Sequence, residues 1–312
     1  MKAGMIRKIF AALGYLGYTL AVLAVLLWFL FPAASVRAWL ETQLDGLNPA
    51  LTWKIRGLRF TLPVGLVATD IRISDGDQTT PLLRIDRLAV RLDPAVLLAH
   101  KKEVPLSYTL QTLGGTVKGK VFVARAGSGM RCSGTMRNLQ IGRMTRVWRE
   151  MGRTAAGSLS GRFTWQGEWR RPALGALQGD FVLSAGDIGL QRPILSLDRL
   201  KFNRMSVKVS LENGVVTFAD GKVESRFFSA GYGGTVTLMP YFQESGINMR
   251  GFLAPRPELL SRLHDDAAVS LIREQLQDGK LSFTVSGTLL EPGILFHGIS
   301  GVIDGVIERS AR

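Results

Sequence analysis

The residue types that most often carry catalysis or bind metals are sparse in this 312-residue chain. Its three histidines, His100, His264 and His297, are far apart in sequence and have dissimilar neighbours. The group His264-Asp265-Asp266 has ligand-type side chains, but consecutive residues of a helix point in different directions. The single cysteine, Cys132, excludes an intrachain disulfide and a cluster of thiolate ligands. We therefore expect no metal site.

Common catalytic motifs are also missing from the sequence. There is no Gly-x-Ser-x-Gly nucleophile elbow, and no P-loop, His-Glu-x-x-His or dinucleotide-binding fingerprint. The glycine-rich run 231–234 lacks the spacing of such a loop and lies among strand-like segments. Carboxylates are few and fall mainly at turns, such as Asp75, Asp77 and Asp220. The sequence thus predicts a non-catalytic protein without a cofactor.

An apolar segment near the N-terminus predicts a membrane anchor. Residues 9–31 contain no charged side chain, and a helix needs about 20 apolar residues to cross a hydrocarbon core of roughly 30 Å. Aromatic side chains in both halves of the segment suit the two membrane interfaces. The residues that we take to mark the span are Ile9, Tyr15, Leu20, Leu26, Trp28 and Phe31.

The charges on either side of this segment predict its orientation. Lys2, Arg7 and Lys8 precede it without an acidic residue, whereas the charges beyond it are mixed. This bias puts a short leader, residues 1–8, in the cytoplasm and everything after the span outside it. The alternative is a signal peptide processed near residues 32–35, although signal peptides have apolar regions of only about 7–15 residues.

The net charge of +14 would suit nucleic acid, but an exported location argues against that partner. Part of the excess lies between residues 125 and 153, where seven arginines face one acidic residue, Glu150. The stretch is either a basic surface for anionic lipid headgroups or a solvated arginine-rich surface. The arginines are Arg125, Arg131, Arg137, Arg143, Arg146, Arg149 and Arg153.

Beyond the anchor, the hydrophobic period predicts one helix and then many strands. A mostly apolar stripe at helical spacing favours a juxtamembrane helix within residues 32–50. From residue 51 to 312 the period is mainly two, which is typical of strands. The alternation slips near Asp86-Arg87, where we expect a β-bulge or strong coiling of the strand. Asn213-Gly214 lies between alternating runs and predicts a hairpin from Arg204 to Ala219.

The strands share one apolar and one polar face, as in an antiparallel sheet that is wet on one side. We therefore expect a mainly β protein, in which a single transmembrane helix precedes a long, curved, mostly antiparallel sheet. Two helices, at residues 141–151 and 257–278, are expected to cover the apolar sheet face. Representative residues of that face are Val207, Val209, Val236, Leu238, Phe283 and Val285.

A group of residues in the first strands resembles a known family. Leu62, Pro63 and Gly65 are followed by Asp70-Ile71-Arg72 and then by Asp86 in a run Pro81-Leu82-Leu83-Arg84-Ile85-Asp86. This order, with its short basic leader and single span, resembles the N component (GspN) of bacterial type II secretion systems. The resemblance implies a bacterial inner-membrane, single-pass protein with a periplasmic main domain. It further implies a non-catalytic scaffold role with other secretion-system subunits as partners.

The same β organisation also looks like the AsmA-type envelope proteins. That likeness implies a different function, in which an apolar groove of the sheet binds or transfers lipid. The two hypotheses predict different surfaces. A docking module should cover its apolar face with its own helices, whereas a lipid-binding protein should leave that face continuous and open.

Overall fold

The computed structural model describes most of the chain from residue 30 onward. The described ranges are 30–46, 51–62, 64–75, 81–92, 103–124, 128–168, 174–194, 197–239, 241–261 and 278–297, with isolated positions at 14–15, 17–19, 22, 26, 270, 274 and 276. They divide between two compact units, residues 1–111 and 112–312.

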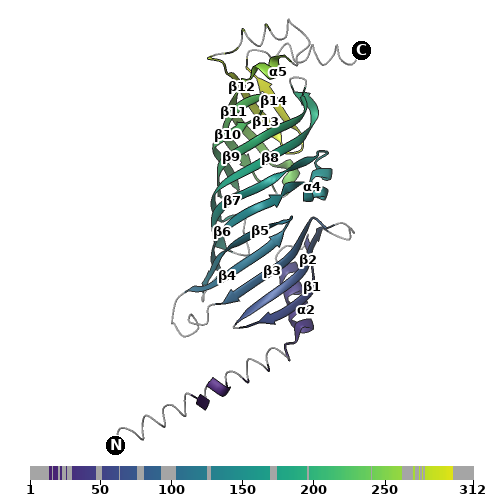
Figure 1. Ribbon diagram of the computed structural model, residues 1–312, viewed down its shortest axis with the longest axis vertical. Coiled ribbons are helices and arrows are strands. Elements are labelled where there is room, and N and C mark those ends of the chain that lie inside the picture. The colour runs from purple at the N-terminus through teal and green to yellow at the C-terminus, as the bar shows by residue number, and fades with distance from the viewer. Residues whose placement is uncertain are drawn as a thin grey trace, which may run out of the picture. The chain divides into compact units, whose positions relative to one another are not determined.

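The described residues form fourteen strands, each hydrogen-bonded to the next in chain order (Figure 1). The predicted mainly β class is therefore confirmed. The strands are β1 (Leu51–Thr61), β2 (Gly65–Asp75), β3 (Leu83–Leu92), β4 (Glu103–Thr112), β5 (Gly115–Ala124), β6 (Gly129–Gln140), β7 (Ala155–Glu168), β8 (Ala176–Ile194), β9 (Leu197–Glu212), β10 (Val215–Glu224), β11 (Phe228–Thr237), β12 (Gly246–Pro255), β13 (Leu281–Thr288) and β14 (Pro292–Phe296).

The first unit packs one helix against its sheet. Helix α2 (Ala33–Asp45) ends at Gly46, which confirms the predicted juxtamembrane helix. Leu40 and Leu44 of this helix pack against a buried cluster that includes Ile55 and Ile71. The apolar face of β1–β3 is thus covered by a helix of its own chain.

The predicted slip in alternation is present, but its cause differs from the expected bulge. Ile85 and Leu88 pack in the same cluster although they are three residues apart. The registers on either side of Asp86 are continuous with β2, so no residue is inserted in this pairing. Instead, Asp70 of β2 has a φ of 48°, in the left-handed region. That conformation turns the side chains to the other face without shifting the register.

The second unit is a coiled sheet with several true irregularities (Figure 1). The register shifts around Asn138 in β6, Ala185 in β8 and Asp220 in β10, and each of these residues has a positive φ. Bulges increase strand twist and bend a sheet locally. The curvature of this unit is therefore built from repeated bulges.

The hairpin around Asn213-Gly214 is confirmed. Strands β9 and β10 pair in register on both sides of it, from Val215 opposite Glu212 onward. Asn213 and Gly214 have φ values of 50° and 77°. Positive φ at both central residues is the geometry of a type I′ turn, which matches the twist of the two strands.

The helices of the second unit are shorter than the sequence predicted, within the residues that the structure describes. The predicted helix 141–151 is a 3₁₀ turn, η1 (Ile141–Arg143), followed by α4 (Thr145–Glu150). A second 3₁₀ turn, η3 (Phe242–Glu244), links β11 and β12. The predicted helix 257–278 begins as α5 (Pro257–Leu260), and most of the remainder lies outside the described residues.

Candidate functional site

One face of the second unit is apolar from β5 to β14. In the described registers, the cross-strand partners on this face are hydrophobic residues or glycines. The polar groups at these paired positions are the thiol of Cys132, the indole N–H of Trp165 and the hydroxyl of Tyr232. Ten strands spaced about 4.8 Å apart extend such a face over roughly 40 Å. We call these paired positions the apolar face.

The centre of the apolar face is neither sealed nor fully open. Residues that lie under other chain segments are buried, such as Phe228, Leu281 and Phe296 toward one end. On the central strands β6–β9, Leu139 and Phe202 are buried, and most of the other large side chains are half-buried. These half-buried residues are Met136, Phe163, Trp165, Phe181, Val207 and Val209. The described helices of this unit, six and four residues long, are too short to cover ten strands.

Aromatic rings lie close against glycines on this face. A methyl group added at Gly179 would lie 2.8 Å from carbons of the Phe181 ring, and one added at Gly161 would lie 2.7 Å from it. Likewise, a methyl group added at Gly175 would lie 2.6 Å from Nε1 of the Trp165 ring. Glycine in a strand marks a close approach by another group. The rings therefore lie along the sheet.

The structure brings most of the sequence-predicted apolar residues onto this face. Val207 and Val209 lie on β9, Val236 on β11, and Phe283 and Val285 on β13. Of these, Val236 is buried and the others are half-buried. Leu238 lies just beyond the end of β11, where its backbone N–H donates to the Gly214 carbonyl at 2.8 Å. Phe163, Trp165 and Phe181 were not among the predicted residues, although Phe163 and Trp165 alternate with polar residues along their strand.

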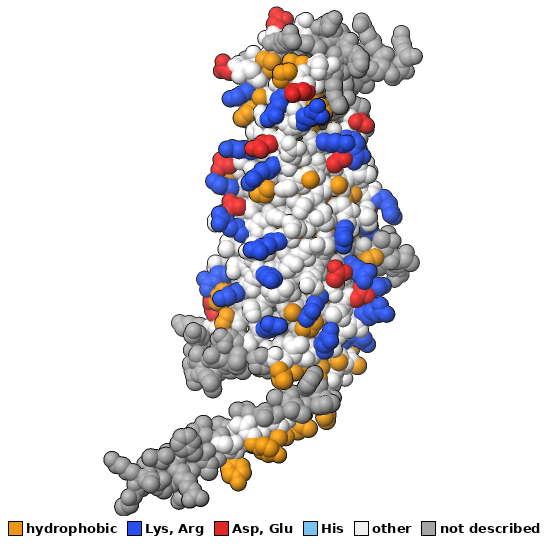
Figure 2. All heavy atoms as spheres, in the orientation of Figure 1, with side chains coloured by type: hydrophobic (Ala, Val, Ile, Leu, Met, Phe, Trp, Pro, Cys, Tyr) orange, Lys and Arg blue, Asp and Glu red, His pale blue; other side chains and the backbone are white. Residues whose placement is uncertain are grey.

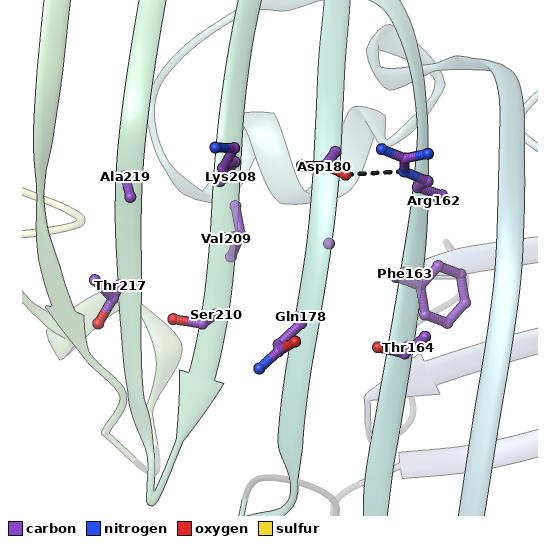
Figure 3. Close-up of a pocket in the computed structure, with 11 residues that line it drawn as sticks. Arg162, Phe163, Thr164, Gln178, Asp180, Lys208, Val209, Ser210, Thr217 and Ala219 are labelled. Atoms are coloured by element: carbon purple, nitrogen blue, oxygen red, sulfur yellow. Dashed lines mark hydrogen bonds and ion pairs between the residues drawn. The ribbon is translucent and has the colours of Figure 1, made fainter.

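The opposite face of the second unit is polar. Figure 2 shows Lys and Arg side chains spread along these strands. An open hollow of about 430 Å³ spans four of them, and its lining is drawn in Figure 3. Two cross-strand rows form its floor, one beginning at Arg162 and the other at Thr164. The rows are Arg162, Asp180, Lys208 and Ala219, and Thr164, Gln178, Ser210 and Thr217.

The charges of this hollow are paired with one another. Arg162 Nε donates to Asp180 at 2.8 Å, and Lys208 Nζ donates to Asp220 at 2.7 Å. The second hydrogen bond raises the pKa of Lys208 and lowers that of Asp220. Exposed pairs of this kind contribute about 0–1 kcal/mol each. The lining holds no paired nucleophile and general base, so it is a polar surface hollow and not a catalytic arrangement.

The family-motif residues of the first unit surround one carboxylate. Asp70, whose side chain is 12% exposed, lies 2.9 Å from Arg72 and from Arg84 and 3.8 Å from Arg56. The hydrogen bond from Arg72, together with the nearby charges of Arg84 and Arg56, holds the pKa of the Asp70 carboxyl below its usual range. The cluster joins three neighbouring strands at the point where the side-chain alternation slips.

The other motif residues have less distinctive surroundings. Gly65 begins β2 opposite Arg91, and Asp86 lies 3.7 Å from Arg84. Leu62 is exposed in the turn before β2, and Pro63 lies outside the described residues. The motif therefore has a structural role at Asp70, and nothing in its geometry indicates ligand binding.

The outer edge of β1 is blocked by helix α2. The Trp53 backbone N–H donates to Asp45 at 2.8 Å, and the Ile55 N–H donates to Glu41 at 2.7 Å. Arg37 of the same helix donates to the Arg56 carbonyl at 3.2 Å. Free edge strands offer a template for unwanted pairing. These three contacts satisfy groups that would otherwise form such a template.

Most residues of the predicted anchor lie outside the described part of the chain, including Ile9, Leu20 and Trp28 and the leader residues Lys2, Arg7 and Lys8. Tyr15 and Leu26 are 77% and 50% exposed, and the Phe31 ring lies 5.9 Å from that of Phe60. Among the described residues, no helix combines the length and apolarity required to cross a bilayer. The span therefore stays a prediction.

The described residues also contain no group of three or more potential metal ligands. His264, Asp265, Asp266 and His100 lie outside the described part. His297 follows β14, where its Nε2 lies 2.9 Å from the Thr284 hydroxyl.

Comparison with known proteins gives no relative from which a function could be carried over. No protein-family model, curated protein or solved structure matches this chain. The class of protein is therefore defined by the fold alone, as a mainly β chain with an extended apolar sheet face.

Proposed function

We propose that this chain is a lipid-binding protein of the bacterial envelope, in which acyl chains lie on the apolar face of the second unit. A single observation carries the proposal. The paired positions of β5–β14 form a continuous surface without charge, and most of the large residues at its centre are half-buried. Soluble monomers rarely expose contiguous apolar patches above about a few hundred Å², and larger ones mark binding sites.

The chemistry of this face favours an acyl chain over a protein partner. Protein interfaces contain about one hydrogen bond per 100–200 Å². At the described paired positions the apolar face offers three polar groups for such bonds, the Cys132 thiol, the Trp165 indole N–H and the Tyr232 hydroxyl, and that hydroxyl is buried without a partner among the described residues. A hydrocarbon chain needs no hydrogen bond, so a long surface lined by Phe163, Phe181 and Val207 suits it.

The setting of the proposal comes from the sequence. The apolar segment at residues 9–31 would anchor the chain in the inner membrane, with its N-terminus in the cytoplasm and the sheet in the periplasm. Such an anchor keeps the apolar face near a supply of lipid. The hydrophobic effect provides about 25 cal/mol per Å² of apolar surface removed from water, which favours transfer of an acyl chain onto this face.

The test is the lipid content of the full chain after gentle detergent purification, with two matched variants. Val207→Asp puts a charge on the apolar face, and Ser210→Asp puts the same charge on the polar face of the same strand. We expect phospholipid to be extracted from the wild type and from Ser210→Asp, and much less from Val207→Asp. Equal amounts from both variants, or none from the wild type, would contradict the proposal.

A second candidate function is the accessory role in type II secretion that the resemblance implies. The polar hollow around Gln178 and Ser210 favours it, since a docking module needs a hydrophilic surface for partner subunits. Deletion of the chain would then trap secreted proteins in the periplasm. Normal secretion with an altered lipid balance of the envelope would leave lipid binding as the function.

A further inference from the structure

The connection between β6 and β7 is the most basic part of the second unit. It contains Arg143 in η1, Arg146 and Arg149 in α4, and Arg153 just before β7, against the single acid Glu150. Because it joins two adjacent strands, this segment lies at the margin of the sheet (Figure 1). We call these four arginines and Glu150 the basic margin.

Among the described residues, one arginine of the basic margin has a carboxylate partner. Arg146 is 4% exposed, and its Nε lies 2.7 Å from Glu150. Within the part of the chain that the structure describes, no carboxylate pairs with Arg143, Arg149 or Arg153. The single acid is therefore already engaged, and the segment keeps a net positive charge that a bound anion would balance.

One nitrogen of the Arg153 guanidinium lacks an acceptor. Its Nε is buried and has no hydrogen-bond partner among the described residues. Burial lowers the pKa of the Arg153 side chain, although arginine stays protonated at neutral pH. A buried donor without an acceptor costs about 1–3 kcal/mol, and more when it is charged. Arg153 as a whole is only half-buried, so part of the residue stays open to a ligand with acceptor oxygens.

The basic margin leads directly onto the apolar face. Met151 is buried at the end of α4, and Ala155 begins β7 opposite Ile188. Ile188 packs against the buried cluster around Phe202, and Leu159 lies four residues farther along β7. Cationic and apolar groups are therefore neighbours along one short stretch of chain. That combination fits a ligand with an anionic end and an apolar end.

We propose that the basic margin binds the phosphate of an anionic phospholipid whose acyl chains lie on the apolar face. The proposal rests on the lipid-binding function above and adds the class of lipid. Arg153 and Arg149 contact the headgroup, since arginine binds phosphate oxygens in a bidentate manner. Arg146 acts indirectly, because its ion pair with Glu150 holds the turn of α4 in place.

The experiment offers the full-length protein an equimolar mixture of dioleoyl phosphatidylglycerol and dioleoyl phosphatidylcholine in mild detergent, followed by native mass spectrometry. Wild-type protein should carry phosphatidylglycerol in about fivefold excess, or about 1 kcal/mol, because both lipids have a phosphate but the arginines repel the quaternary ammonium of phosphatidylcholine. Arg149→Gln/Arg153→Gln should reduce the ratio toward one with little change in total lipid. The matched control, Arg162→Gln/Arg204→Gln, removes the same charge from the polar-face strands and should keep the preference.

Arg149 is exposed, so Arg149→Gln alone tests the proposal if the double variant fails to fold. The leader residues are the same in all variants, so any preference that comes from the anchor is unchanged. Equal binding of the two lipids by wild type overturns the headgroup site and leaves lipid binding intact. A preference that survives in the folded double variant overturns it as well. Absence of bound lipid in every protein overturns the proposed function itself.

Discussion

The ring of Phe181 lies against Gly179 of its own strand, so closely that a methyl group there would be 2.8 Å from two ring carbons. The ring also lies over Gly161 of the neighbouring strand. An aromatic side chain that lies along a sheet adds apolar surface without filling the space above it. Phe181 therefore packs along the apolar face of the second unit and contacts two of its glycines.

This relationship predicts the effect of Gly179→Ala. The added methyl would contact the Phe181 ring and the Arg162 carbonyl, each at 2.8 Å. Overpacking of this kind destabilises a protein by about 1–3 kcal/mol, and the ring would be displaced away from the sheet. Thermal unfolding followed by circular dichroism should show a lower midpoint. Gly246→Ala is the control, because nothing lies within 4 Å of a methyl group at Gly246; an equal loss in both variants would contradict the packing argument.

The half-buried Trp165 predicts a spectroscopic signal of lipid binding. Its ring lies on the apolar face over Gly175, where a bound acyl chain would contact it. Phospholipid with brominated acyl chains should therefore quench part of the tryptophan fluorescence of the full chain. Trp165→Phe should remove most of the quenched component. Trp53→Phe, in the first unit, should leave it unchanged, and the opposite pattern would argue against lipid on this face.

The hydrogen bonds from β1 to α2 predict the result of removing both carboxylates. Glu41→Ala/Asp45→Ala would leave the backbone N–H groups of Ile55 and Trp53 without their acceptors. Each net hydrogen bond contributes about 0.5–1.5 kcal/mol, so unfolding should require about 1–3 kcal/mol less. Chemical denaturation measures this loss. Gln43→Ala changes an exposed residue of the same helix and should have no comparable effect.

The arginine cluster around Asp70 predicts a dependence of stability on pH. The pKa of Asp70 is lower in the folded protein than the ordinary value of about 3.9 in an unfolded chain. The ion pairs therefore stabilise the fold fully above about pH 4, and this contribution disappears as the pH falls through the lowered pKa.

Asp70→Asn isolates this charge, since asparagine also accepts a positive φ. Its arginine partners are exposed, so the loss at neutral pH should be about 1 kcal/mol or less. Denaturation curves at pH 7 and at pH 2–3 measure it. The difference between wild type and variant should shrink at the acidic end, and a constant difference would exclude the ionic contribution.

The hydroxyl of Tyr232 predicts that its removal does not lower the stability of the fold. It is buried and has no hydrogen-bond partner among the described residues, and burial raises the pKa of Tyr232 to about 12. Removing an unsatisfied polar group is neutral or stabilising. Tyr232→Phe should therefore match or exceed the wild-type unfolding midpoint. A clear drop in that midpoint would show that the hydroxyl has an acceptor.

Local sequence signals were sufficient for many elements. Alternation of Val207, Lys208 and Val209 predicts a strand with an apolar and a polar face, because successive side chains of a strand point to opposite sides. Asn213-Gly214 predicts its turn for an equally local reason, since both residues accept positive φ. The helix before Gly46 follows from helical spacing. None of these features depends on which strands are neighbours.

The tertiary structure decided which residues of distant segments contact one another. Whether Phe181 contacts Gly161, whether Glu41 reaches the edge of β1, and whether Arg153 finds an acceptor all depend on registers between distant segments. The slip at Asp70 looked like a bulge in β3, but it arises from a positive φ in the neighbouring strand β2. Periodicity reports the direction of side chains along one strand, whereas these contacts form between strands and require the assembled sheet.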